Sequence, residues 1–309
     1  MMASPLTALF LTPSAREWIT RTTTARVLNA FERACNLINQ DDAILALVTS
    51  ERGLTPFAVV IASEDRTPFR AVTAASTVKV EPNRLSLDSL HINFESATLW
   101  NPVPDWPALR RMLTDNPPLL EALTTMAVEV TVQGSLLELY RPHPSPLLHS
   151  REGGRGLEKI VFERARRGGG ELVNGLLGGS VERCLAGAKL LAGLGSGLTP
   201  AGDDFIVGVL LGAWAGLFGE GREQLGLSIV RTAAPLTTTL SVEYLRAAAR
   251  GECIQHWHAL FGALLTLDAP AIHEAVQALT SIGHTSGADA LAGFLSGRYL
   301  TSQSQPPVS

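Results

Sequence analysis

The chain of 309 residues is long enough for one large domain or two ordinary ones, each with a sizeable buried core. Its 46% hydrophobic and 17% charged residues are typical of a folded protein and exclude a disordered one. A formal net charge of −4 excludes the basic surface that nucleic acid or an anionic membrane requires, so we expect a small molecule or another protein as partner.

Cysteine usage and the N-terminal segment indicate the compartment. Cys35, Cys184 and Cys253 lie far apart and form no CxxC pair, which is typical of reduced thiols and not of a disulfide framework or a zinc site. The first residues hold no cationic region followed by an apolar one, so we expect no signal peptide. The most apolar run, Phe205–Gly219, is short for a bilayer span. We therefore expect a cytoplasmic protein.

Up to about residue 140 the pattern predicts β-rich structure after an opening helix. The apolar residues of Ala25–Leu37 recur at helical spacing, which predicts that helix. A second helix is expected at Trp106–Asp115, where Pro-Asp-Trp-Pro precedes similar spacing. The strands should form an antiparallel, barrel-like or sandwich-like layer. They are predicted, between turn residues, at Ala43–Val48, Phe57–Ala62, Ala71–Val80, Leu85–Ile92 and Val128–Val132.

Residues 141–156 hold prolines and glycines without periodicity, which is typical of a linker. Gly153–Gly156 and Gly168–Gly170 are predicted as flexible connections. Beyond the linker the spacing of apolar residues becomes helical, and short Gly, Ser and Thr turns separate the segments. Helices are predicted at Leu157–Arg167, Val181–Leu194, Phe205–Phe218, Arg222–Ala234, Ser241–Arg250, Ile254–Leu267, Ala269–Thr280 and Ala288–Tyr299.

The sequence therefore predicts an α+β protein. A β-rich, barrel- or sandwich-like domain with an N-terminal helix is expected over residues 1–145. A mainly α-helical domain is expected over residues 146–300, and residues 301–309 are predicted to be a frayed tail.

The most unusual stretch is Gly195–Asp204, with the sequence GSGLTPAGDD. Thr199 is predicted as an N-cap and Pro200 as the first helical residue, where the missing amide costs nothing. The glycines before them would let a ligand approach bare backbone amides. The alternative is a well-capped helix start whose acids only stabilise the helix dipole.

Gly283–Asp289 (GHTSGAD) repeats this turn with one residue fewer. After each turn an aspartate is followed by glycines four and eight positions later, and residues at that spacing share one helix face. If the two glycine stripes pack together, the aspartates meet at one end of the seam. The alternative is two unrelated tight helix pairs, each with its own cap. The two sets are Asp204, Gly208 and Gly212, and Asp289, Gly293 and Gly297.

Two carboxylates in a partly buried place cannot both stay charged without support. A metal ion, a shared proton or the N–H donors of a substrate amide would provide it. The bare amides favour an anion such as phosphate or carboxylate, whereas Asp203 and Asp204 accept from –NH₂ groups or hold Mg²⁺. A ligand with an anionic end and an amide end fits both, and so does a metal-bridged phosphate.

Two further side chains are candidates. Arg246 lies on the helix predicted after Thr237–Ser241 and could clamp a carboxylate or phosphate. The alternative there is a Ser-capped helix with solvated arginines and Glu243 as a partner. His284 lies inside the second turn and is a candidate acid or base, with a hydrogen-bonded structural histidine as its alternative.

The stretch GSGLTPAGDDFIVG resembles a bacterial family that includes the AllH-type subunit of oxamate carbamoyltransferase, in anaerobic allantoin breakdown. The resemblance extends through residues 241–252, 283–293 and 97–100. It implies a part in transferring a carbamoyl group between oxalurate and phosphate, giving oxamate and carbamoyl phosphate, in a three-component enzyme. Where relatives often carry Ser this chain has Ala201, so no hydroxyl acts there. The matched positions are Gly195, Gly197, Leu198, Thr199, Pro200, Gly202, Asp203, Asp204, Thr285, Ser286, Gly287 and Asp289.

The leading hypothesis is a carbamoyltransferase component of purine catabolism that binds an anionic amide or phosphate at paired helix N-termini, together with partner subunits. One alternative is a divalent-metal enzyme acting on a phosphate or amide bond, with Mg²⁺ as the cofactor. Another is a non-catalytic assembly subunit. The predicted catalytic residues are Asp203, Asp204 and Asp289. The predicted substrate-binding residues are Gly195, Ser196, Gly197, Thr199, Gly202, Arg246, His284, Thr285, Ser286 and Gly287.

Overall fold

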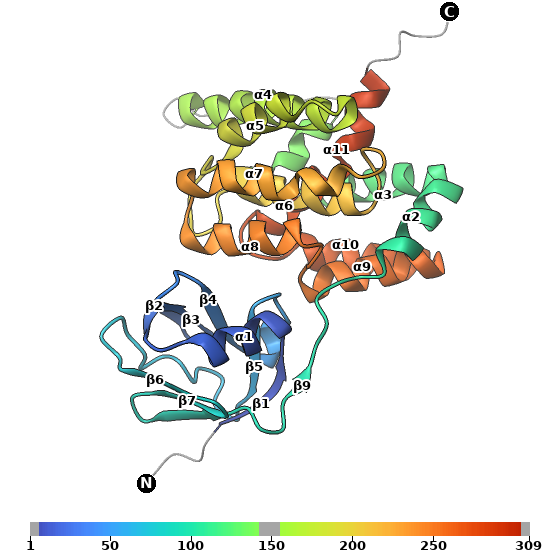
Figure 1. The fold of residues 1–309 in the computed structure, drawn as a ribbon. Helices are drawn as coiled ribbons and strands as arrows, with labels where there is room; N and C mark the ends of the chain where they lie inside the picture. The colour runs from blue at the N-terminus through green and yellow to red at the C-terminus, as the bar shows by residue number, and fades with distance from the viewer. Residues whose placement is uncertain (1–5, 142–154, 304–309) are drawn as a thin grey trace, which may run out of the picture. The chain divides into compact units, whose positions relative to one another are not determined.

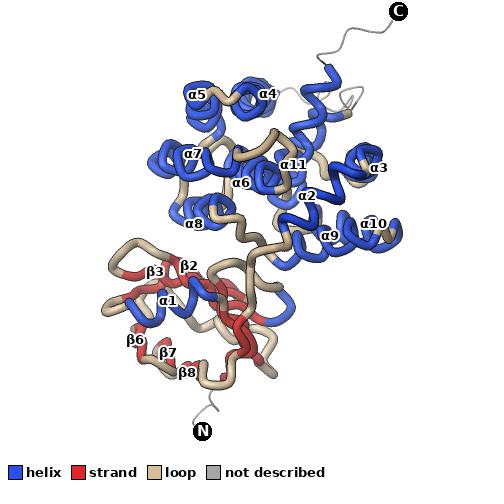
Figure 2. The backbone as a smooth tube through the Cα atoms, turned by 45° about the vertical axis from the view of Figure 1, so that its right-hand side comes forward, coloured by secondary structure: helices blue, strands red, loops and turns tan. Residues whose placement is uncertain are grey.

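The computed structural model describes residues 6–141 and 155–303, which fold into two compact units. Unit 1 runs to Val103 and includes Cys253–Gln255, and unit 2 takes in Pro104–Glu252 and the chain from His256 onward. The strands lie in unit 1, whereas unit 2 is helical over its described residues (Figures 1 and 2). The predicted α+β class is confirmed. The predicted boundary at residues 145 and 146 and residues 304–309 of the predicted tail lie outside the described residues.

Unit 1 is built on a nine-stranded sheet in the order β2-β3-β4-β5-β1-β8-β7-β6, with β9 beside β1. Because β2 and β6 contact each other, the sheet curls into a nearly closed barrel. It is mixed and not antiparallel as expected, since β5 pairs in parallel with β4, and β1 with β8 and β9. The strands are β1 (Leu6–Leu11), β2 (Ala25–Phe31), β3 (Ala34–Asn39), β4 (Ile44–Thr49), β5 (Ala58–Ala62), β6 (Val78–Glu81), β7 (Arg84–Leu87), β8 (Leu90–Asn93) and β9 (Thr98–Leu99).

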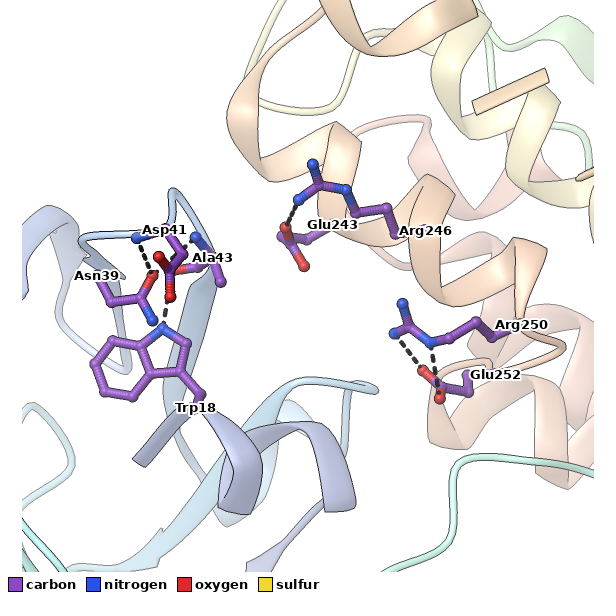
Figure 3. Close-up of polar contacts among 8 residues, drawn as sticks. All are labelled: Trp18, Asn39, Asp41, Ala43, Glu243, Arg246, Arg250 and Glu252. Atoms are coloured by element: carbon purple, nitrogen blue, oxygen red, sulfur yellow. Dashed lines mark hydrogen bonds and ion pairs between the residues drawn. The ribbon is translucent and has the colours of Figure 1, made fainter. Parts of the chain in front are cut away.

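The opening helix is α1 (Pro13–Arg21), and its place follows from its cap and its buried face. The Thr12 hydroxyl accepts a hydrogen bond from the Ala15 amide at 3.1 Å, which is the usual N-cap arrangement. The Trp18 side chain is buried in the barrel core, and its indole N–H donates to the Ala43 carbonyl at 2.8 Å (Figure 3). The buried indole thus keeps its polar atom satisfied.

The helix predicted at Ala25–Leu37 is wrong, because that segment forms the hairpin of β2 and β3. The two strands pair from Ala25 opposite Asn39 to Phe31 opposite Ala34, and β4 pairs along the other side of β3. Backbone pairing on both sides of β3 outweighs a weak local preference for helix.

Other strands differ from prediction in their bounds. Leu85–Ile92 is divided into β7 and β8 by a turn in which Asp88 has φ 51°. Of the predicted strand Ala71–Val80, only the end belongs to β6. The strand β1 lies between β5 and β8 and was not predicted.

Three helices and a short 3₁₀ helix, η2 (Leu136–Tyr140), form the first part of unit 2. These helices are α2 (Trp106–Asp115), α3 (Pro117–Glu129) and α4 (Arg155–Gly178). The rest of the unit consists of α5 (Val181–Leu191), α6 (Ala201–Trp214), η4 (Arg222–Leu225), α7 (Gly226–Ala233), η5 (Ala234–Leu236), α8 (Thr239–Ala249), α9 (Gln255–Thr266), α10 (Ala269–Thr280) and α11 (Ser286–Gln303). In the described part of the chain, none of the helices combines the length and the apolar character needed to cross a membrane.

The helices predicted at Trp106–Asp115 and Ala269–Thr280 are confirmed with the same bounds. The strand at Val128–Val132 is wrong, because its first residues end the unpredicted helix α3. Gly168–Gly170 lies inside α4 and is no flexible connection. A Cβ at Gly168 would come within 2.9 Å of the Leu190 side chain, so this glycine lets α4 and α5 approach closely. Gly153, Gly154 and most of the predicted linker lie outside the described residues, whereas Arg155 and Gly156 begin α4 and are no flexible connection.

Candidate functional site

The helices α6 and α11 meet along the two predicted glycine stripes, and theirs is the most extensive helix–helix contact in unit 2. A Cβ built on Gly208 would overlap the carbonyl oxygen of Ala290 on α11. Likewise, a Cβ on Gly293 would overlap the carbonyl oxygen of Phe205 on α6. The predicted packing of one stripe against the other is therefore confirmed, with backbone against backbone.

The first turn leads into α6 through glycines in conformations that other residues rarely adopt. Gly195 has φ 113° and Gly197 has φ 100°. The predicted cap is wrong: Pro200 is the N-cap, and its carbonyl accepts the amides of Asp203 and Asp204 at 2.9 and 3.2 Å. The Thr199 hydroxyl is thereby free to reach across to the other turn.

A hydrogen bond between two hydroxyls joins the turns. Thr199 Oγ1 lies 3.0 Å from Ser286 Oγ, the side chain of the first residue of α11. The N-termini of α6 and α11 thus converge at one place. Both helices direct the positive end of their dipole there.

Asp203 is buried and has both carboxylate oxygens occupied. Oδ1 accepts the Gly193 amide at 3.0 Å, and Oδ2 accepts the Thr237 hydroxyl. Burial raises the pKa of Asp203, while these two hydrogen bonds act to lower it. Asp203 therefore fastens the start of the first turn to the segment before α8.

The segment before α8 also supports the tip of the first turn. Thr238, the N-cap of α8, donates from its hydroxyl to the Leu198 carbonyl at 2.5 Å. The Ser241 hydroxyl lies 3.5 Å from the same oxygen. The predicted contribution of the Thr237–Ser241 segment to this region is thus a supporting one, made through hydroxyl groups.

Asp204 and Asp289 lie buried beneath the joined turns, and each leaves one carboxyl oxygen, Oδ2, without a partner among the described residues. Burial raises the pKa of Asp204 well above its ordinary value. The charge of Asp289 adds to that rise, and the hydroxyls of Ser286 and Thr199 oppose it. The two aspartates are therefore close enough to influence each other, as the glycine spacing predicts.

Asp289 is fully buried, and its Oδ1 accepts the Leu136 amide at 2.6 Å. Burial raises its pKa to about 7, against the lowering effects of this amide and of the Thr285 hydroxyl. Asp289 is therefore close to the midpoint of its titration at neutral pH, and burial favours the protonated form of Asp204.

Above these acids the turns present backbone amides. Among the described residues, the amides of Ser196, Gly197 and Thr199 donate to no other group, and the same is true of those of His284 and Thr285. The side chains of Ser196 and His284 are exposed, and that of Thr285 is partly exposed. The site has a rim of amides and hydroxyls over a floor of buried carboxyl groups whose pKa values are raised.

The small residues of the turns have packing roles of their own. A Cβ on Gly202 would overlap the Leu191 carbonyl, and a Cβ on Gly287 would overlap the Leu279 carbonyl. Both predicted binding glycines are thus buried against α5 and α10. Their direct contact with a ligand stays a prediction.

Arg246 has a partner outside the turns. Its guanidinium lies 2.6 Å from Glu243 Oε1, and Arg250 pairs similarly with Glu252 at 2.7 Å (Figure 3). The Glu243 partner agrees with the alternative that the sequence left open, but the predicted serine cap is wrong, because Thr238 caps the helix. The role of Arg246 in substrate binding stays a prediction.

The structure also shows where metal-ligand side chains and cavities lie relative to the predicted site residues. Within the residues the structure describes, no three His, Cys, Asp or Glu side chains are grouped so as to hold a metal ion. Cavities of about 370 and 320 Å³ lie in unit 1, and neither is lined by a predicted site residue.

Sequence reasoning missed η2 as a part of the site. The Leu136 amide binds Asp289, and the Tyr140 hydroxyl donates to the Ala292 carbonyl at 2.7 Å, so η2 is anchored twice on α11. Because a backbone amide acts here over a separation of 153 residues, no local pattern signals the contact.

Comparison with known families matches both parts of the chain. A family model described as the oxamate carbamoyltransferase subunit AllH matches residues 191–298, which hold both turns. A model described as the AllH family N-terminal domain matches residues 8–99, which hold the barrel. No solved structure matches the chain.

Proposed function

Because the chain belongs to the AllH family, we propose that it is a subunit of an oxamate carbamoyltransferase of allantoin and purine catabolism, and works with partner subunits. The proposed reaction converts oxalurate and phosphate into oxamate and carbamoyl phosphate. The observation that carries this proposal is the hydroxyl bridge between Thr199 and Ser286, which joins two helix N-termini at one place.

The chemistry of the rim suits an anionic ligand. Helix N-termini and unused amides bind carboxylate and phosphate oxygens, and here two such N-termini act together. The floor opposes an anion less than two charged carboxylates would, since burial raises the pKa of Asp204 well above its ordinary value and that of Asp289 to about 7. Oxamate, oxalurate and phosphate all carry the anionic oxygens that this rim would bind.

The three aspartates, predicted as catalytic, divide into two roles in this proposal. Asp203 is a positioning residue, because both of its oxygens hold the turn in place. Asp204 would act through the hydroxyls of Thr199 and Ser286, as the acid of a short proton relay. Asp289 would act on Asp204 through its charge.

The proposed reaction needs a proton for its leaving group, and the relay would supply it. A phosphate oxygen attacks the ureido carbon of oxalurate, the bond from that carbon to the oxamate nitrogen breaks, and the leaving nitrogen takes up a proton. A hydroxyl at the rim would deliver this proton and be reprotonated from Asp204, and Asp204 would regain a proton from the hydrogen phosphate as it becomes the phosphoryl group of carbamoyl phosphate. General acid catalysis of this kind contributes about 10²–10⁴-fold to a rate.

We further propose that the protein acts in the cytoplasm. Its three cysteines are all buried and none is in a disulfide, as is usual in a reducing compartment. Burial raises the pKa of the Cys35 thiol to about 12, so this thiol is protected from ionisation and oxidation. We propose neither a nucleic acid nor a membrane as a partner.

A calorimetric titration of the full chain and of the assembled complex with oxamate, oxalurate and carbamoyl phosphate tests the proposed function. We expect at least oxamate to bind, and Thr199→Val combined with Ser286→Ala to weaken its binding at least tenfold by removing the hydroxyl bridge. Binding that requires added Mg²⁺ would favour the metal-dependent alternative. Absence of binding by both chain and complex would leave the assembly role and contradict the proposal.

A further inference from the structure

We propose that Asp289 couples anion binding at the paired turns to the uptake of one proton, so that the site takes its anion together with a proton. This inference rests on the proposed function, and it specifies how the charge of the ligand is balanced.

The geometry beneath the turns leaves two carboxyl oxygens with nothing to bind. Oδ2 of Asp204 and Oδ2 of Asp289 are both buried and both lack a hydrogen-bond partner among the described residues. Because α6 and α11 touch through their backbones at Gly208 and Gly293, the seam has no room for a compensating basic side chain. A proton on each carboxyl group is what removes the cost of burying its charge.

The charged surroundings of Asp289 are few. From α6 it is faced by Asp204, on which the charges of both Asp289 and Asp203 act. From η2 come Glu138, whose carboxylate accepts the Gly134 amide at 2.8 Å, and Tyr140.

The helices α3, α4 and α10 also pack against α11. The main influences on the pKa of Asp289 are its burial, the Leu136 amide and the Thr285 hydroxyl, and none of them is a charged group of these three helices. Among the described residues, the exposed His284 is the remaining titratable side chain of the turns.

A change of pH near neutrality acts on Asp289, which loses its proton as the pH rises through about 7. Burial and the charges of Asp289 and Asp203 raise the pKa of Asp204 and favour its protonated form. Above that pH the unliganded site carries a negative charge under its rim, which repels an incoming anion. Binding then has to restore the proton, so the affinity falls with rising pH by up to about tenfold per pH unit.

Calorimetry with oxamate in two buffers of different ionisation enthalpy measures the proton uptake directly. Oxamate is the probe because its carboxylate keeps its charge from about pH 5 to pH 9. At about pH 8 we expect uptake approaching one proton in the wild type and close to none in Asp289→Asn. The affinity of this variant should stay the same from about pH 6 to pH 9, because the asparagine amide is neutral throughout.

Asp268→Asn is the matched control, since it makes the same exchange at an aspartate outside the turns, the exposed N-cap of α10. This variant should keep the proton uptake and the pH dependence of the wild type. Uptake that survives in Asp289→Asn or vanishes in Asp268→Asn contradicts the inference. If Asp289→Asn fails to fold, the pH dependence of the wild type tests the inference. An affinity of the wild type for oxamate that does not change between about pH 6 and pH 9 overturns the inference.

Failure of this inference is distinct from failure of the proposed function. Oxamate binding without proton uptake overturns the coupling and leaves the anion site standing. Absence of oxamate binding at both ends of the pH range, by the chain and by the complex, overturns both.

Discussion

Replacing Gly208 with alanine is expected to lower the free energy of unfolding by about 3 kcal/mol or more, a large share of the stability of a typical protein. The added methyl group would overlap the Ala290 carbonyl oxygen, and a backbone atom cannot move aside as a flexible side chain can. The helices α6 and α11 would have to separate, which would also disturb the hydroxyl bridge at their N-termini. Thermal or denaturant unfolding followed by circular dichroism measures the change.

Gly262→Ala is the matched control for this substitution. Gly262 lies on α9, and a Cβ there would have nothing within 4 Å. We expect this variant to gain about 0.5–1 kcal/mol, because alanine favours a helix more than glycine does. If Gly208→Ala is as stable as the wild type, the backbone contact between α6 and α11 is contradicted.

Asp204→Asn is expected to reduce carbamoyl transfer by the assembled complex about 100-fold or more while oxamate still binds. The asparagine carbonyl oxygen can still accept from the hydroxyls of Ser286 and Thr199, so the rim keeps its shape. Its amide has no acidic proton, so the proposed relay cannot reprotonate the hydroxyl that serves the leaving nitrogen. Steady-state rates, with affinities from calorimetry, separate the two effects.

Asp268→Asn provides the comparison for Asp204→Asn. Asp268 is the exposed N-cap of α10, and asparagine caps a helix as well as aspartate does. Its variant should transfer carbamoyl groups at the wild-type rate. Full activity of Asp204→Asn would exclude Asp204 as the acid and favour an assembly role for the subunit.

The helical half of the fold could be predicted from local pattern because its signals are local. A proline at the start of α2 and α10, with apolar residues three and four apart, gave the correct bounds. The paired turns were likewise visible, since the spacing from Asp204 to Gly208 and from Asp289 to Gly293 places each set on one helix face.

The errors arise where distant contacts decide the structure. Ala25–Leu37 has helical spacing, yet β4 and the hairpin itself supply the backbone partners that make it two strands. Gly168–Gly170 was expected to be flexible, but there the absence of side chains serves the close approach of α4 and α5. Glycine spacing alone does not tell a hinge from a contact.

The candidate site shows the same division between local and distant signals. Its glycines, hydroxyls and aspartates were named from the sequence, and the joining of the two turns followed from their repeat. The different states of Asp203 and Asp204 could not be predicted, although these residues are adjacent. Asp203 accepts hydrogen bonds from Thr237 and Gly193. Asp204 instead lies near Asp289 and the hydroxyls of Thr199 and Ser286.

The most direct test of the paired-turn site is a nuclear magnetic resonance titration of the full chain with oxamate, with the glycine and serine amides labelled. We predict that the amide signals of Ser196 and Gly197 in the first turn and of Ser286 in the second shift together, along one binding curve. Signals that move in one turn alone, or in unit 1 with both turns unchanged, would contradict a shared site at the two helix N-termini.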